Sequence, residues 1–60
     1  MNAIEIRDLA RRLRDAHGNA AIAEAARKAQ DFENDGDTGQ AQTWRRIETA
    51  LMQMRGPRES

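Results

Sequence analysis

An alanine-rich segment from residue 20 to residue 32 constrains the fold of this chain more than any other feature. Its apolar side chains recur at helical spacing and fall on one side of a helical wheel: Ile22, Ala25, Ala26, Ala29 and Phe32. Charged and amide side chains fall mainly on the opposite side, which is the pattern of an amphipathic helix with one buried face. Because alanine favours helix but buries little area, this face admits a close neighbour and contributes little to a core.

Capping residues divide the sequence into three predicted α-helices, at about residues 3–17, 20–35 and 38–55. Asn2, followed three positions later by Glu5, has the spacing of a capping box, in which each side chain accepts from the other's free backbone N–H. Asp37 and Gln40 repeat this spacing before the third helix. Asn19 is predicted to cap the second helix. The fold class that follows is all-α.

Two glycines and a proline mark where these helices end. Gly18 and Gly36 suit the positive φ found just after a helix, and Pro57 cannot continue the third helix. Only two residues join the first two helices, so we expect them to cross steeply. The turn after Gly36 allows the second and third helices to pack as a hairpin. Residues 1–55 are expected to form a single helical domain, and residues 56–60 a flexible C-terminal tail.

Large apolar side chains are scarce for a domain of this size. Leucine, isoleucine, valine and phenylalanine together make up less than about 20% of the residues, which leaves a small core. Small scaffolds usually need an additional stabilising feature, but the chain has no cysteine for a disulfide and too few histidines for a structural metal. Self-association is the stabilising feature that remains. We therefore expect a homodimer in which the hairpin is completed as a helical bundle.

Apolar residues of the first and third helices predict a protein interface. The set comprises Ile4, Trp44, Ile47, Leu51, Met52 and Met54. All but Ile4 come from the third helix, where methionines beside a tryptophan suit adaptable partner binding. The alternative places Trp44 and Met54 in the chain's own core. Ile4 and Met52 are then isolated exposed side chains, which are common on protein surfaces.

Three arginines of the first helix form a basic ridge, at Arg7, Arg11 and Arg14. Their spacing places them on one side of the helix, as for a small patch that binds nucleic-acid phosphates. Asp8 and Asp15 lie beside the ridge and weaken its positive charge, and no aromatic residue is interleaved for base stacking. A small nucleic-acid-associated regulator is therefore the alternative function.

No catalytic or cofactor site can be assembled from the sequence. His17 has no nucleophile or carboxylate placed to work with it, and it is expected to border the core at the end of its helix. The segment 35–39 is acidic, which is unsuited to phosphate, and it misses the spacing of a calcium loop. We therefore predict a chain that is not an enzyme and takes no metal, cofactor or small-molecule substrate.

Charge and hydropathy set the expected location. Ten acidic and ten basic residues cancel, which gives no global attraction to nucleic acid or to an anionic membrane. No apolar run is long enough for a transmembrane helix, and the N-terminus lacks the layout of a signal peptide. A cytoplasmic protein of bacterial type is the expectation that follows.

Short sequence signatures run along most of the chain: His17-Gly18, Ala25, Ala29, Gly36-Asp37, Trp44 and Ile47. This pattern resembles that of a group of short uncharacterised bacterial all-helical proteins, which implies a compact helical fold and no particular activity. About half the chain carries a second pattern, made by Ala25, Ala29, Phe32, Gly36-Asp37 and Ala41. It resembles, more weakly, a single tetratricopeptide-type helical hairpin. The function that we predict rests instead on the scarcity of large apolar side chains and on the apolar stripe of Trp44, Ile47 and Leu51. It is a non-enzymatic protein–protein interaction or regulatory adaptor module.

Overall fold

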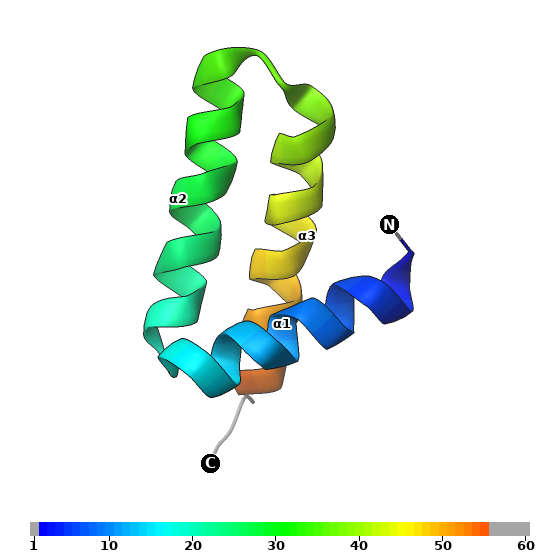
Figure 1. Cartoon of the computed structure of the whole chain (residues 1–60), viewed down its shortest axis with the longest axis vertical. Coiled ribbons are helices and arrows are strands. Elements are labelled where there is room, and N and C mark those ends of the chain that lie inside the picture. Colours follow the sequence, from blue (N-terminus) through cyan, green and yellow to red (C-terminus); the bar gives the residue numbers. More distant parts are fainter. Residues whose placement is uncertain (1, 56–60) are drawn as a thin grey trace.

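The computed structural model describes residues 2–55, which form three α-helices (Figure 1). The helices are α1 (Ala3–His17), α2 (Ala20–Asp35) and α3 (Thr38–Arg55). Helices α2 and α3 lie side by side and antiparallel, and α1 crosses the open end of this hairpin steeply (Figure 1). The predicted all-α class, helix bounds and hairpin are confirmed. The predicted flexible tail at residues 56–60 falls outside the described residues.

Local sequence explains where α1 and α3 begin. The Glu5 backbone N–H donates to Asn2 Oδ1 at 2.9 Å, and the Asn2 N–H donates to Glu5 Oε1 at 3.1 Å. Both halves of the predicted capping box are therefore present at α1. At α3 the Gln40 N–H donates to Asp37 Oδ1 at 3.2 Å. These side chains satisfy backbone donors that a helix leaves unpaired at its N-terminus.

The start of α2 differs from the prediction. Asn19 has helical backbone angles (φ −65°, ψ −21°), and its side chain makes no capping hydrogen bond. A side-chain cap needs an extended backbone at that position, so the prediction that Asn19 caps α2 is wrong. Gly18 supplies the change of direction instead, with φ 60°, and its carbonyl accepts from the Ala21 N–H at 3.1 Å. Gly36 likewise adopts positive φ, 80°, after α2, as predicted.

The core is built largely from alanine. Its buried apolar residues are Ile6, Ala10, Ala21, Ala25, Ala29, Ala41, Ile47 and Leu51. Five of these eight are alanines, so the helices can pack closely while hiding little side-chain area. On α2 the buried line runs through Ala21, which the helical wheel did not single out, whereas Ile22 and Phe32 are only half-buried. Larger side chains therefore form the rim of this helix contact.

The rim of the core is closed by half-buried side chains from all three helices: Leu9, Leu13, Ile22, Trp44, Ala50 and Met54. The Trp44 ring also has the ammonium group of Lys28 on α2 above it, 5.4 Å from the ring centroid. A cation at this distance is attracted by the negative face of the ring. Trp44 is thus covered partly by apolar neighbours and partly by a basic side chain.

Arg45 of α3 forms ion pairs on the surface with Glu33 of α2 and Glu48 of α3, and we call these three residues the charged clamp. Arg45 donates from Nε and Nη2 to the two carboxylate oxygens of Glu33, at 3.2 and 3.1 Å, and from Nη1 to Glu48 Oε1 at 3.1 Å. The hydrogen bonds to Glu33, and then the one to Glu48, raise the pKa of Arg45 above its ordinary value. The forked geometry sets the register of the two helices more than it stabilises them, because the pair is solvent-exposed.

Within residues 2–55, no helix combines the length and the apolar character needed to cross a membrane.

The alanine contact predicts a clear difference between two identical substitutions on α2. Ala25 is fully buried against the core, so Ala25→Leu should force the helices apart and lower the free energy of unfolding by about 1–3 kcal/mol. Ala23 is exposed on the same helix, and Ala23→Leu should change it by less than about 0.5 kcal/mol. Urea unfolding followed by circular dichroism measures both values. Equal effects of the two variants would contradict this packing.

Candidate interaction surface

The predicted interface residues do not form one surface. Ile47 and Leu51 are 0% and 2% exposed and lie in the chain's own core, so a partner cannot reach them. We therefore leave these two residues out of the candidate surface. Trp44 and Met54 are half-buried and pack against the same core, as the alternative placement predicted. Helix α1 explains why Ile47 and Leu51 are buried, because its residues Ile6 and Ala10 belong to the same core cluster.

Two large apolar residues of the predicted interface are exposed. Ile4 on α1 is 80% exposed and Met52 on α3 is 50% exposed. On a helix with 3.6 residues per turn, Ile4 lies opposite the buried Ile6 and Ala10. Met52 follows Arg45 by seven residues, so it lies on the side of α3 from which that arginine reaches α2. Ile4 and Met52 thus lie on different helices, and each belongs to a surface of its own.

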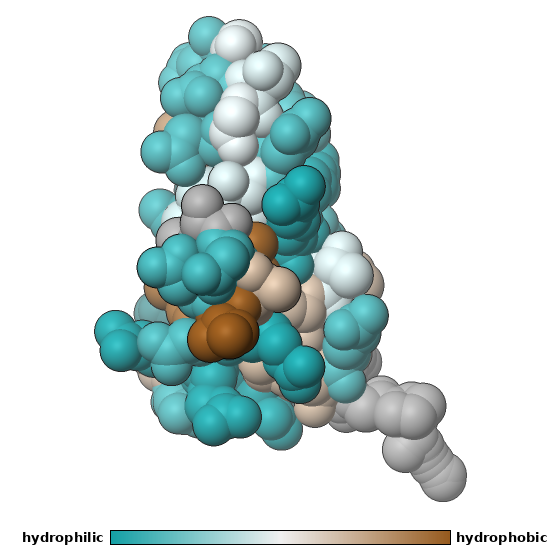
Figure 2. Space-filling view, turned by 90° about the vertical axis from the view of Figure 1, so that its right-hand side faces the viewer, coloured by the Kyte–Doolittle hydropathy of each residue, from teal (hydrophilic) through white to brown (hydrophobic). Residues whose placement is uncertain are grey.

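Ile4 shares a shallow hollow with charged residues of its own helix. The hollow is lined by Ile4, Arg7, Asp8 and Arg11, and we call this set the α1 outer face. Their spacing of three, four and seven residues from Ile4 places them on one side of a helix, so α1 alone creates the arrangement. Figure 2 looks toward the N-terminal end of α1 and shows strongly apolar surface standing among hydrophilic side chains.

The charges of the α1 outer face are unequally paired. Asp8 forms an exposed ion pair with Arg12 one turn later, with Oδ2 and Nη2 3.2 Å apart. In the part of the chain that the structure describes, neither Arg7 nor Arg11 makes an ion pair. The single carboxylate of the face is thus balanced by an arginine beside it. Two guanidinium groups remain available next to Ile4.

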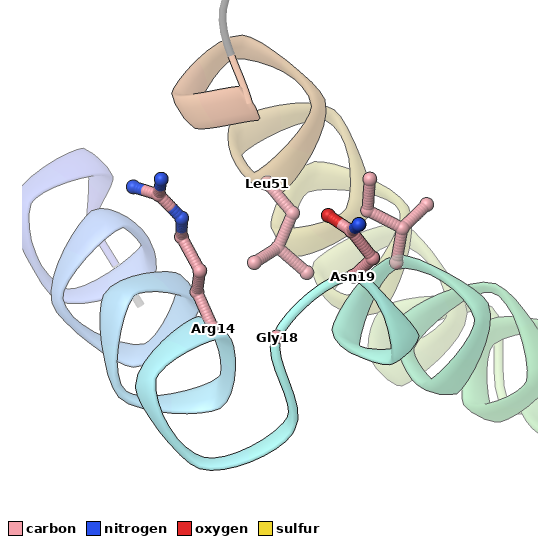
Figure 3. Close-up of a pocket in the computed structure, with 5 residues that line it drawn as sticks. Arg14, Gly18, Asn19 and Leu51 are labelled. Carbon is pink, nitrogen blue, oxygen red and sulfur yellow. The ribbon is translucent and has the colours of Figure 1, made fainter.

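The third arginine of the predicted ridge lines a different hollow. Arg14 lies with Gly18, Asn19, Ile22 and Leu51 at the corner between α1 and α2. Figure 3 shows the Arg14 side chain rising from α1, and Leu51 pointing from α3 into the space between α1 and α2. The basic ridge is therefore divided, with Arg7 and Arg11 in one hollow and Arg14 in another.

The described residues offer little for catalysis or metal binding. His17, the single histidine, is exposed at the end of α1 and does not border the core as expected. Between residues 2 and 55, no group of three or more histidine, aspartate or glutamate side chains is placed to hold a metal ion. The expectations that the chain is not an enzyme and takes no cofactor stay predictions.

Comparison of the chain with known protein families, with characterised proteins and with solved structures gives no match. The resemblances to short bacterial helical proteins and to a tetratricopeptide-type hairpin therefore stay predictions.

The pairing of the arginines predicts their chemical reactivity. The deprotonated guanidine attacks the carbonyl carbons of phenylglyoxal. Arg45, whose guanidinium is held by Glu33 and Glu48 and whose pKa is raised by them, should therefore be modified more slowly than Arg7 and Arg11, which make no ion pair with described residues. Mass spectrometry of peptides from briefly treated protein measures each rate. Glu33→Gln serves as the control, since it removes one of the two carboxylates that hold Arg45 and should speed the modification of Arg45. Equal rates in the unaltered chain would contradict the assignment.

Proposed function

We propose that this chain is a non-enzymatic protein–protein interaction module of the regulatory adaptor type, and that the α1 outer face is its contact surface. The observation that carries the proposal is Ile4, which is 80% exposed in a hollow that also holds Arg7 and Arg11. An isolated exposed isoleucine needs no explanation. An exposed isoleucine that shares a hollow with two available arginines is different, because arginine is enriched at protein interfaces and the buried centre of an interface is more apolar than its rim.

The energetics of this face favour contact with another protein. Covering the Ile4 side chain would contribute about 1.5–3 kcal/mol, the usual value for removing a large aliphatic side chain from water. Arginine adds hydrogen bonds of fixed geometry to carboxylates and can lay its aliphatic stem over apolar surface. Arginine is also among the residue types enriched at the few positions that carry most of the binding energy of an interface.

The face is also held in place before any partner arrives. The capping box of Asn2 and Glu5 fixes the first turn of α1, and Ile6 and Ala10 are buried on the opposite side of the helix. A preformed helix face avoids most of the entropy loss that a disordered segment would meet on binding. This rigidity supports a role in recognition.

Self-association through the α2–α3 hairpin stays a separate prediction. Because Ile47 and Leu51 are buried within the chain, the hairpin can offer a second copy only Trp44, Met52 and Met54 from the predicted set. Of these three, Met52 is the most accessible large side chain. The predicted dimer would therefore use the hairpin, whereas the partner would use the α1 outer face. One experiment can distinguish contacts at these two surfaces.

Site-specific photocrosslinking tests both surfaces in cells that make the protein. A benzophenone amino acid at position 4 should form discrete adducts with another protein, and Arg11→Gln should reduce their yield. The same group at position 23, an exposed site on α2, is the matched control and should form none. A product of twice the chain's mass from position 52 would support the hairpin dimer. Adducts of equal yield at positions 4 and 23 would contradict the proposal.

A nucleic-acid-associated regulator is the second candidate function. It is favoured by the basic ridge of Arg7, Arg11 and Arg14, which are all exposed and make no ion pair with any described residue. Against it, α1 contains no phenylalanine, tyrosine or tryptophan to stack on bases, and Asp15 lies beside the ridge.

Salt dependence distinguishes this second candidate. If the three arginines neutralise three phosphates of duplex DNA, the logarithm of the binding constant should fall with the logarithm of salt concentration with a slope of about −2.7. Fluorescence anisotropy with a labelled duplex measures the slope. Replacing Arg7, Arg11 and Arg14 together by glutamine should abolish binding. Absence of binding by the unaltered chain at low salt would exclude this function.

A further inference from the structure

We infer that the α1 outer face binds an acidic amphipathic helix of a partner protein. This inference rests on the proposed function and names the chemistry of the partner. It combines three observations: the charge that the face leaves unpaired, the exposed isoleucine beside the charges, and the length and regularity of the helix that carries them.

Charge selects an acidic partner. Arg7 and Arg11 have no ion-pair partner among the described residues, while Asp8 is already balanced by Arg12. The lining residues carry a net positive charge even with Asp8 included, so two copies of the face would meet with like charge. A second copy is therefore disfavoured at this surface, and carboxylates opposite the two guanidinium groups are favoured.

The apolar side chain selects a protein over a phosphate backbone. Ile4 lines the same hollow as the arginines and is 80% exposed, so a ligand that fills the hollow must cover it. Phosphates of a nucleic acid offer no apolar group for this contact, and no aromatic side chain lines the hollow to hold a base. An aliphatic side chain flanked by carboxylates meets both requirements.

The geometry of α1 selects a helix. Ile4 and Arg11 are seven residues apart, which is about 10 Å along a helix axis at 1.5 Å per residue. A partner helix that places leucine and glutamate at spacings of three, four and seven residues repeats this distance on one of its own faces. Two helices packed face to face can then pair two carboxylates with Arg7 and Arg11 while a leucine covers Ile4.

Two synthetic peptides test the inference on the full chain. One is a helical peptide of four turns with leucines along one face and glutamates beside them. The other has the same leucines with lysine in place of every glutamate. In ¹⁵N-correlated NMR spectra, the acidic peptide should shift the amide signals of Ile4, Arg7 and Arg11 most, and its dissociation constant should rise with salt. The lysine peptide should leave these signals unchanged.

Matched variants separate the contributions. Ile4→Ser should weaken binding of the acidic peptide about tenfold, since an isoleucine contact is lost, and Met52→Gln should leave it unchanged. Arg11→Gln should weaken binding and reduce its salt dependence, whereas Arg14→Gln removes the same charge from a different hollow and should have a much smaller effect. Isoleucine and serine have similar helix propensities, so Ile4→Ser should remain folded.

Each other outcome overturns the inference. Equal shifts with both peptides would mean that leucine alone is recognised, and shifts outside α1 would place the contact elsewhere. Binding of a DNA duplex that ignores Ile4→Ser, with no binding of the acidic peptide, would assign the arginines to nucleic acid. If crosslinking at position 4 captures a protein but the acidic peptide does not bind, the proposed function stands and this inference falls. If both experiments fail, both fall.

Discussion

The close contact of α2 with α3 through alanine is the constraint on which the rest of this structure depends. Ala21, Ala25 and Ala29 bury one side of α2, so the helices pack closely but hide little apolar area. The larger contributions lie around this contact. Lys28 covers part of the Trp44 ring, and a charged clamp fixes the register of the hairpin near its turn. The free energy of folding is therefore the sum of many small contributions rather than of one large core.

Helix α1 supplies what the hairpin lacks. Ile6 and Ala10 on its inner side complete the cluster that contains Ile47 and Leu51, at the end of the hairpin that α1 crosses (Figure 1). A helix that closes a core with one side must present its other side to solvent. The exposure of Ile4 follows directly from this placement. The element that completes the fold is thus also the one that carries the candidate contact surface.

How far the sequence predicts this structure depends on how local each feature is. The helix bounds were predictable because caps and glycines act within a few residues, as Asn2 and Gly36 do. The prediction that Asn19 caps α2 was wrong because the chain changes direction at Gly18, whose carbonyl accepts from Ala21, and Asn19 already has helical backbone angles. The burial of Ile47 and Leu51 could not be derived from one helical wheel. It depends on where α1 packs, which is a tertiary property.

The candidate surface joins two sets of residues that sequence analysis kept apart by chemical type. Ile4 belonged to the predicted protein interface, and Arg7 and Arg11 to the predicted nucleic-acid ridge, yet all three line one hollow. Their helical spacing is visible in the sequence, so this grouping could have been predicted once α1 was assigned. The combination also has a physical consequence. Positive charge alone attracts any polyanion, whereas an apolar group beside the charges favours ligands that also bring apolar surface. A mixed face of this kind therefore selects for an acidic protein segment.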